Sequence, residues 1–307
     1  MYHVNGTFNG IGDRILDIIG SMLLAECTKK QTNHVWHSNN VVMQREDKII
    51  KRNYHIDDFK FHFGTLGQVN SDKRFPKGSN IVPIHYTDSG LSFSPLYLCA
   101  SLNKPLSQYM HMCACFSRLA QTSIKPSEDI KAILPTNLDN TIGIHLRRSD
   151  KINKRPILTH EMNISEYEEL INSLLVQATK TEYQQSFLII SDDPPFINLF
   201  KSRLQNLKPD AQFVNMPENA SDVVDFFALT MCKCIYQGIK YSTFSILAAM
   251  IGNIQLYNFA KNHEPYSLLH YWKHCVQLTC QGMDMKYIPS IDQSKTIVIP
   301  KLYAKLL

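Results

Sequence analysis

Two periods of hydrophobic spacing alternate along the second half of the chain, and they predict a regular succession of strands and helices. The stretch TIGIHLR at 141–147 is an almost continuous apolar run, which is typical of a buried strand. SEYEELINSLLVQAT at 165–179 carries its apolar residues at helical spacing, with Ser165 and Glu168 in the positions of a capping box. Further strands are expected at 186–191, 211–216, 234–241 and 254–259, and further helices at 192–207, 221–233 and 242–252.

This succession of strand and helix predicts a parallel, doubly wound sheet. Pro194 and Pro195 suit the first turn of one helix, Ser221 suits the N-cap of the next, and Gly252 is expected to end the last. Ligands of such sheets bind beyond the carboxyl ends of the strands. The polar residues that follow each strand are therefore the first candidates for chemistry.

The first half of the chain has a weaker pattern. NGTFNGIGDR forms a glycine-rich turn, and a helix with apolar residues at 11, 15, 18, 19, 22 and 23 follows it. Strands are expected at 35–40 and 81–86, and a helix is expected at 104–121. The polar stretch 44–75 is expected to loop over the surface.

Residues 123–140 contain two prolines and several turn residues, and they are the expected hinge between two domains. We expect an N-terminal Rossmann-like domain over 1–138 and a C-terminal ligand-binding domain over 139–261. The remaining residues, 262–307, form an expected tail. Its apolar segment 266–278 is expected to pack back on the domains.

Composition narrows the class of protein. The 307 residues are 44% hydrophobic and 19% charged, which excludes a disordered chain. The net charge of +5 is scattered, so it suits a small anionic ligand better than nucleic acid. No apolar run is long enough to span a membrane, and the first ten residues lack the pattern of a signal peptide. A cytoplasmic chain is expected, of bacterial or viral origin unless it is the trimmed form of an anchored enzyme.

The eight cysteines are expected to be reduced and mostly buried. They form no C-x2-C pair, so a zinc site is not expected. His270, His274 and Cys275 have a possible ligand spacing on one helix face, but a packed or surface-lying aromatic segment is the favoured interpretation. No residue is therefore expected to bind a metal ion.

The strand end at 145–150 carries the clearest chemistry. His145 and Arg147 share one face of the predicted strand, Arg148 lies on the other, and Asp150 begins the following loop. Arginine suits phosphate because its planar fork binds two oxygens and keeps its charge. We expect Arg147 to reach a ligand and an internal carboxylate to hold Arg148. A purely structural ion-pair cluster is the alternative.

Three further stretches follow strands or open helices. Ser242 or Thr243 is expected to cap a helix whose N-terminus can bind an anion, with ordinary capping as the alternative. Asp192 and Asp193 could bind ligand hydroxyls or a metal, or could cap the helix that follows them. In NGIGDR, Asp13 and Arg14 are expected to be exposed. The dinucleotide fingerprint is incomplete there, because Ile15 replaces its last glycine.

Four motifs in this order, HLRRSDK, FLIISDDPPF, DFFALTMCK and YSTFSILAAMIGN, resemble those of the fucosyltransferase superfamily. That superfamily comprises the α1,2-, α1,6- and protein O-fucosyltransferases, with the signature H-x-R-R-x-D. NGIGDR resembles the turn that opens its first domain. The resemblance covers about residues 5–30 and 140–255. SDDP and the STFS segment are most similar to the α1,2 branch, whereas a lysine after the motif aspartate is typical of the α1,6 branch.

The resemblance implies an α/β fold of GT-B type, with two Rossmann-like, doubly wound domains facing a cleft. It also implies an inverting, metal-independent transfer of L-fucose from GDP-fucose to a glycan hydroxyl. GDP-fucose is then the donor substrate, and no cofactor is needed. The implied partners are a nucleotide sugar and an oligosaccharide or glycoprotein acceptor. Alternatives are another nucleotide-sugar donor, or a degenerate protein that binds a glycan or nucleotide without turnover.

The resemblance also implies residue roles. Arg147 would bind the β-phosphate and stabilise the charge on leaving GDP. Thr243 and Ser245 would contact phosphate, His145 would lie against the nucleotide, and Asp225 would meet the guanine. Two extra residues separate Asp225 from STFS compared with the α1,2 pattern, which weakens the last of these roles. The implied donor-binding set is Gly12, His145, Arg147, Arg148, Asp192, Asp225, Ser242, Thr243 and Ser245.

The general base has several candidates. The α1,6 branch places a glutamate four residues after the motif lysine, but Arg155 stands at that position here. Asp13, Asp150 and Glu161 remain as candidates, and Asp13 is slightly favoured because it lies at a helix start. Asp150 could instead orient the arginines. The expected catalytic residues are Arg147, Asp13 and Asp150.

Overall fold

A computed structural model describes the chain in two compact units, Met1–Ser127 with Leu268–Leu307 and Glu128–Ser267. Each unit is considered by itself. The described residues are 2–5, 10–38, 41–45, 48–52, 54–64, 67–71, 81–82, 98, 102, 108–148, 152, 162–218, 220–239, 242–259, 287–289 and 296–298.

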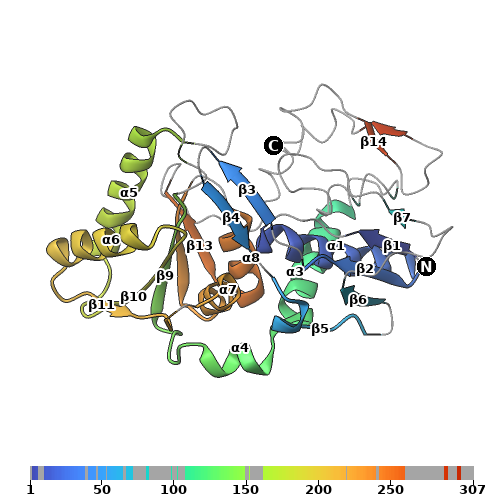
Figure 1. The fold of residues 1–307 in the computed structure, drawn as a ribbon, viewed down its shortest axis with the longest axis horizontal. Coiled ribbons are helices and arrows are strands. Elements are labelled where there is room, and N and C mark those ends of the chain that lie inside the picture. Colours follow the sequence, from blue (N-terminus) through green and yellow to red (C-terminus); the bar gives the residue numbers. More distant parts are fainter. Residues whose placement is uncertain are drawn as a thin grey trace. The chain divides into compact units, whose positions relative to one another are not determined.

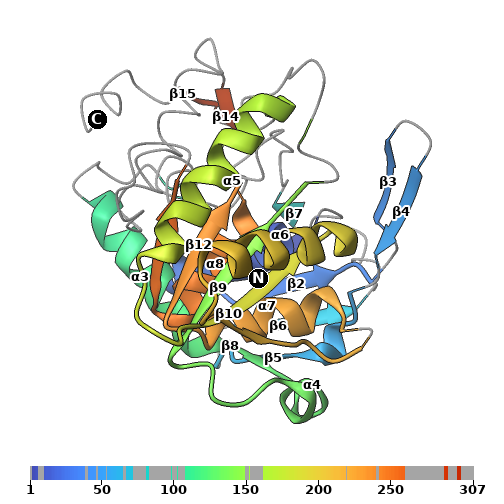
Figure 2. The same ribbon diagram turned by 90° about the vertical axis from the view of Figure 1, so that its left-hand side faces the viewer.

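The second unit is built on a parallel sheet with the strand order β11-β10-β9-β12-β13 (Figures 1 and 2). The chain starts at the central strand β9, moves outward through β10 to β11, and then crosses to β12 and β13 on the other side of β9. Connections therefore diverge between β9 and β12, which is the switch point where doubly wound sheets bind ligands. The strands are β9 Thr141–Leu146, β10 Ser186–Ser191, β11 Gln212–Val214, β12 Cys234–Gly238 and β13 Gln255–Asn258.

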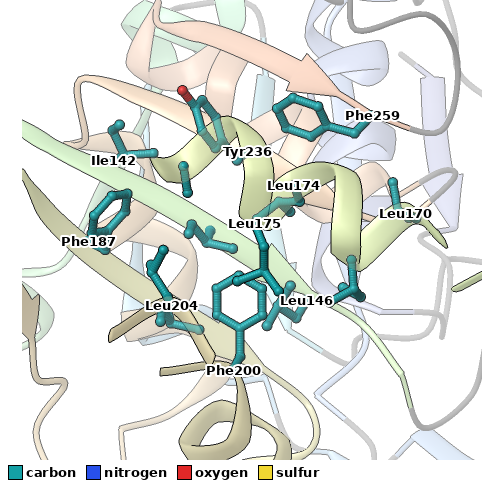
Figure 3. Close-up of a cluster of buried hydrophobic side chains, with 14 of the residues drawn as sticks. Ile142, Leu146, Leu170, Leu174, Leu175, Phe187, Phe200, Leu204, Tyr236 and Phe259 are labelled. Carbon is teal, nitrogen blue, oxygen red and sulfur yellow. The ribbon is translucent and has the colours of Figure 1, made fainter. Parts of the chain in front are cut away.

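Helices cover both faces of this sheet, as the continuous apolar runs of its strands require. Figure 3 shows Leu146 among side chains of α5 and α6, including Leu174 and Phe200, which belong to one buried cluster. The opposite face packs on α7, because a side chain at Gly143 would meet Leu229 there. The helices of this unit are α4 Glu128–Ile133, α5 Ile164–Thr179, α6 Pro194–Leu207, α7 Asp222–Thr230 and α8 Thr243–Gly252.

Most predicted helix starts in this unit are confirmed. Pro194 and Pro195 lie in the first turn of α6, and Ser221 caps α7 by accepting a hydrogen bond from the N–H of Val224 at 3.4 Å. The predicted capping box of Ser165 and Glu168 is wrong. Asn163 and Glu166 form the box two residues earlier.

The reason for this error is that NISE fits the box pattern as well as SEYE does. With Asn163 as the cap, half-exposed Ile164 is the first residue of the helix, and the apolar residues of α5 face the sheet. Glu168 instead pairs with Arg203 of α6, with its Oε2 3.2 Å from Nη1 of the arginine.

Gly252 is the last residue of α8, but its importance comes from close packing. Asn253 adopts the left-handed conformation that ends the helix, with a φ of 52°. A Cβ atom on Gly252 would lie 2.2 Å from the carbonyl oxygen of Thr230, at the end of α7. The absence of a side chain thus lets the ends of α7 and α8 touch.

Gly252→Ala is therefore expected to lower the free energy of unfolding by about 1–3 kcal/mol, because backbone must move to admit the methyl group. Gly143→Ala is a matched comparison, since its Cβ would meet the movable end of Leu229 at 2.6 Å. Urea denaturation of both variants gives the measurement. Equal losses in the two variants would contradict the backbone contact as the cause.

The first unit contains a second parallel sheet, with the order β6-β2-β1-β7. Helix α1, Ile11–Thr28, connects β1 to β2 and packs against α3, Tyr109–Ser123. Arg118 of α3 and Glu26 of α1 form an ion pair at 2.7 Å. The strands are β1 Tyr2–Asn5, β2 Thr32–Trp36, β6 Gly67–Ser71 and β7 Ile81–Val82.

The expected surface loop over 44–75 is wrong, because most of it is regular structure. It contains part of β3, then β4, the 3-10 helix η1, β5 and β6. Short strands that contain polar residues lack the continuous apolar run of a buried strand, so the sequence pattern does not predict them as strands. The smaller elements of the unit are β3 Val41–Arg45, β4 Lys48–Arg52, η1 Ile56–Asp58, β5 Phe59–Phe61, β8 Ile124–Pro126, β14 Tyr287–Pro289 and β15 Thr296–Val298.

Other expectations for this half are met in part. The strand expected at 35–40 lies at β2, several residues earlier, and that expected at 81–86 is described only as β7. The helix expected at 104–121 is described from Tyr109 to Ser123. The expected tail helix at 266–278 lies outside the described residues. None of the helices in the described part of the chain has the length and apolar character needed to span a bilayer.

Candidate functional site

The carboxyl end of β9 anchors one arginine through β10 and α6. The backbone N–H of Arg148 donates to Oδ1 of Asp192 at 2.9 Å, and its Nη1 donates to Oδ2 of Asp193 at 3.0 Å. The guanidinium carbon also lies 4.8 Å from the ring centroid of Phe196. The expectation that a carboxylate holds Arg148 is thereby confirmed. Arg147, the preceding residue, is half-buried at the end of the strand.

Asp192 and Asp193 both serve this anchor. Asp193 is the N-cap of α6, where its Oδ1 accepts a hydrogen bond from the N–H of Phe196 at 3.3 Å. Of the two alternatives for Asp193, capping is the role the structure describes. Within the described residues, no group of three His, Cys, Asp or Glu is arranged to hold a metal ion.

A polar row crosses the sheet just before the strands end. His145, Gln237 and Asn258 are register partners on β9, β12 and β13, so their side chains point to the same face. His145 is 6% exposed, and its ring stacks on Phe244 with centroids 4.9 Å apart. This contact joins the end of β9 to the first turn of α8. The two anion-binding stretches predicted from sequence therefore meet at the switch point.

The N-terminus of α8 has no side-chain cap. Ser242 occupies the N-cap position with φ −153° and ψ 119°, but its side chain makes no capping hydrogen bond. The predicted capping by Ser242 or Thr243 is wrong in this respect. The Oγ of Ser242 is buried and has no hydrogen-bond partner in the described structure. N–H groups in the first turn of a helix attract anions, and among the described residues no side chain caps those of α8.

Gln237 adds a second buried polar atom without a partner. Its Oε1 accepts a hydrogen bond from Nδ2 of Asn258 at 3.3 Å, while its Nε2 has no partner in the described structure. A buried donor without an acceptor is costly and calls for an explanation, such as a ligand. Sequence reasoning missed Gln237. The available signal was a single amide in the otherwise apolar strand CIYQG.

Ser245 lies one turn into α8 and is completely buried. Its Oγ lies 3.5 Å from the carbonyl oxygen of Ser242 and donates to it. The hydroxyl group is therefore turned back into the helix. Ser245 could therefore contact a phosphate only through its backbone N–H group. Thr243 is half-buried and could use either its backbone N–H group or its hydroxyl group.

Asp225 lies in the first turn of α7, next to the start of α8. Phe226, the following residue, meets the ring of Phe244 edge to face at 5.3 Å. Burial, together with the smaller effect of the neighbouring Asp222 charge, raises the pKa of Asp225 to about 7. This carboxyl group thus changes protonation near neutral pH, which is typical of groups at functional sites.

Two buried cysteines of this unit have unreactive thiols. Burial raises the pKa of Cys232 to about 12 and that of Cys234 to about 11. Both thiols stay protonated at neutral pH and are poor nucleophiles or metal ligands in that state.

The glycine-rich turn belongs to the first unit. Gly10 is the N-cap of α1, Gly12 is buried, and Asp13 is half-buried in the first turn. The expectation that Arg14 is exposed is wrong, because only 1% of it is accessible. Its guanidinium lies over the rings of Trp36 and Tyr54, and its Nη1 donates to the carbonyl oxygen of His37. Arg14 lies on the same face of α1 as buried Ile11 and Ile18, so helical spacing agrees with its burial, and its charge was the reason to expect exposure.

Two candidate bases, Asp150 and Glu161, lie outside the described residues, as does Arg155. Asp13 is therefore the one candidate base that the described part of the chain contains. It is on a different unit from the residues at the switch point.

Comparisons with known proteins bear on the fold. No protein-family model and no curated protein sequence matches the chain. Among solved structures, a mutant of FUT1 from Arabidopsis thaliana in complex with GDP matches with a TM-score of 0.52 and 14% identity, over 83% of this chain and 69% of that one. The fucosyltransferase NodZ from Bradyrhizobium matches with a TM-score of 0.48 and 16% identity, over 84% and 95% of the two chains.

POFUT1 in complex with GDP has a TM-score of 0.44 and 12% identity, over 81% of this chain and 94% of that one. The likeness to FUT1 shows the fold that the chain adopts. It is the α/β fold of GT-B type, with helices packed on parallel sheets.

Proposed function

We propose that this chain is a fucosyltransferase that moves L-fucose from GDP-fucose to a hydroxyl group of a glycan acceptor. One observation carries the proposal: the stacking of His145 on Phe244 brings a strand end with two arginines against an uncapped helix N-terminus. This is the environment that a nucleotide diphosphate requires at a switch point. The fold likeness to FUT1 in complex with GDP supports the choice of nucleotide.

The proposed roles follow from this geometry. The N–H groups at the start of α8, with Ser242 and Thr243, bind the diphosphate, and Arg147 neutralises its β-phosphate. Asp193 holds Arg148 and thereby positions the end of β9. Gln237 donates through Nε2 to the bound donor, and His145 lies against the nucleotide. Asp225 accepts hydrogen bonds from the guanine edge.

The reaction is an inverting displacement without a metal ion. The acceptor oxygen attacks the anomeric carbon as the bond to the β-phosphate oxygen breaks, and negative charge grows on GDP. Arg147 and the dipole of α8 stabilise that charge. A base removes the acceptor proton, and Asp13 of the first unit is the proposed base. In this scheme the first unit is the acceptor side and the second is the donor side.

Thermal unfolding with GDP, UDP, ADP and GDP-fucose, each with EDTA, tests the proposal. A nucleotide at about 100 times its dissociation constant stabilises the folded chain by about 2.7 kcal/mol. We expect GDP and GDP-fucose alone to raise the melting temperature. A rise with UDP would indicate a different nucleotide-sugar donor. No rise with any guanine nucleotide would refute the proposed donor.

Turnover requires a separate measurement. Release of GDP from GDP-fucose is expected to accelerate when a glycan mixture is added. Binding of GDP with no turnover on any acceptor would indicate a degenerate protein that has kept only the nucleotide site.

A further inference from the structure

A hollow of about 710 Å³ lies on the first unit, far in sequence from the residues of the donor site. It is formed by η1, β5, the turn at 62–64 and the whole of β6, which is the outer strand of the parallel sheet. The hollow follows the whole side of that edge strand, whereas ligands of such sheets usually bind beyond the carboxyl ends of the strands. Its volume is within the usual range of ligand sites, about 300–1,000 Å³.

Aromatic rings form the apolar part of the hollow. Phe59 and Phe61 stack with centroids 5.5 Å apart and an angle of 14° between their planes. Trp36 braces both rings from the core, at 5.3 Å and 5.9 Å. Phe63 packs on Gly67, where a Cβ atom would come within 2.6 Å of its ring. These rings are held in place before any ligand arrives, which lowers the entropic cost of binding.

Polar groups with unused hydrogen-bonding capacity line the rest of the hollow. Asn70 donates through Nδ2 to Oδ1 of Asn33 at 2.5 Å, which leaves the carbonyl oxygen of Asn70 as an acceptor. Four other side chains form no hydrogen bond or ion pair with the described residues, and they are those of Asp57, His62, Gln68 and Ser71. They offer both donors and acceptors, and no lysine or arginine is among the lining residues that the structure describes.

We propose that this hollow binds a neutral saccharide. The C–H face of a pyranose ring packs on an aromatic ring, and its neighbouring hydroxyl groups match amide and carboxylate side chains. The described lining has no lysine or arginine to bind phosphate, and its many polar groups disfavour a lipid chain. The biological role of the hollow rests on the proposed function: it would hold a part of the acceptor glycan other than the reacting hydroxyl group.

Saturation-transfer NMR on the full chain tests the inference, with chitotetraose, cellotetraose and lacto-N-neotetraose as probes. We expect at least one probe to receive saturation from the protein. Phe63→Ala removes a stacking face and is expected to weaken that binding about tenfold, which equals about 1.4 kcal/mol. Gln68→Ala changes an exposed side chain, so it preserves the fold and is expected to weaken binding several-fold.

Phe213→Ala is the matched control, because it removes a half-buried phenylalanine from the second unit. It should leave saccharide binding unchanged. The thermal shift with GDP is recorded for each variant, so a failed nucleotide site and a failed saccharide site give different results. The inference would be overturned if no saccharide probe binds, or if both pocket variants bind the saccharides as tightly as the wild type does. It would also be overturned if an extended peptide, added to the protein, binds along β6 and the saccharides do not.

Discussion

Arg147→Ala is expected to lower the rate of fucose transfer by about 10²–10³-fold while the chain stays folded. In the proposed mechanism, charge grows on the β-phosphate as the sugar leaves, and Arg147 follows the strand that ends against α8. Removing a preorganised charged donor from such a site costs about 2.7–4 kcal/mol in the transition state. The measurement is GDP release from GDP-fucose in the presence of an acceptor, compared with the wild type.

Two further variants separate charge from geometry. Arg147→Lys keeps the charge but loses the planar fork, so an intermediate rate is expected. Arg203→Ala removes an arginine from α6 that pairs with Glu168, and it should leave the rate nearly unchanged. Rapid transfer by Arg147→Ala would show that another group carries the β-phosphate. Arg148 is poorly placed to take over this role, because its side chain already contacts Asp193 and Phe196.

Asp225→Asn is expected to change how the stability of the chain depends on pH. The pKa of Asp225 is raised from 3.8 to about 7, chiefly by burial. Its contribution to stability is therefore fully present below pH 4 and is lost as the pH rises through 7, because only the unfolded state ionises readily in that window. A shift of this size corresponds to at most about 4 kcal/mol.

The asparagine variant lacks this loss, so its stability relative to the wild type should increase between pH 4 and pH 8. Urea denaturation at several pH values measures the difference. Glu218→Gln, which removes an exposed carboxylate from the same unit, should show no such trend. A constant difference between Asp225→Asn and the wild type across this range would contradict the raised pKa.

Nucleotide binding gives the same residue a functional test. A carboxylate that accepts hydrogen bonds from guanine must be ionised, so stabilisation by GDP should grow as the pH rises toward 8. Asp225→Asn should lose the preference for GDP over ADP. An unchanged preference would remove Asp225 from the guanine site and leave its raised pKa as a consequence of packing.

Sequence patterns predicted the second unit in detail because its strands are buried on both faces. Such strands are continuous apolar runs, and the polar residues that follow them must lie at one edge of the sheet. The sequence could therefore name His145, Arg147 and Ser242 as candidates at the ends of the strands. The first unit was less predictable, since β5 has only three residues and β6 is mostly polar, and both had been expected to be loop.

Local pattern also misjudged single residues whose surroundings come from elsewhere in the chain. Arg14 is a charged residue in the first turn of a helix, for which exposure was expected, yet Trp36 and Tyr54 cover it. Gly252 marks a helix end in sequence, but the carbonyl oxygen of Thr230 decides its importance. The local sequence pattern cannot predict either contact, because each contact joins residues of separate helices or strands.

The sequence by itself determined the class of fold, the order of strands and helices in the second unit, and the strand-end residues that could meet an anion. Periodicity suffices for these because it reflects which faces must be buried. Only the tertiary structure decided that Asp193 holds Arg148, that His145 stacks on Phe244, and that α8 begins without a cap. The same holds for the hollow along β6, because side chains distant in sequence come together there only when the chain folds.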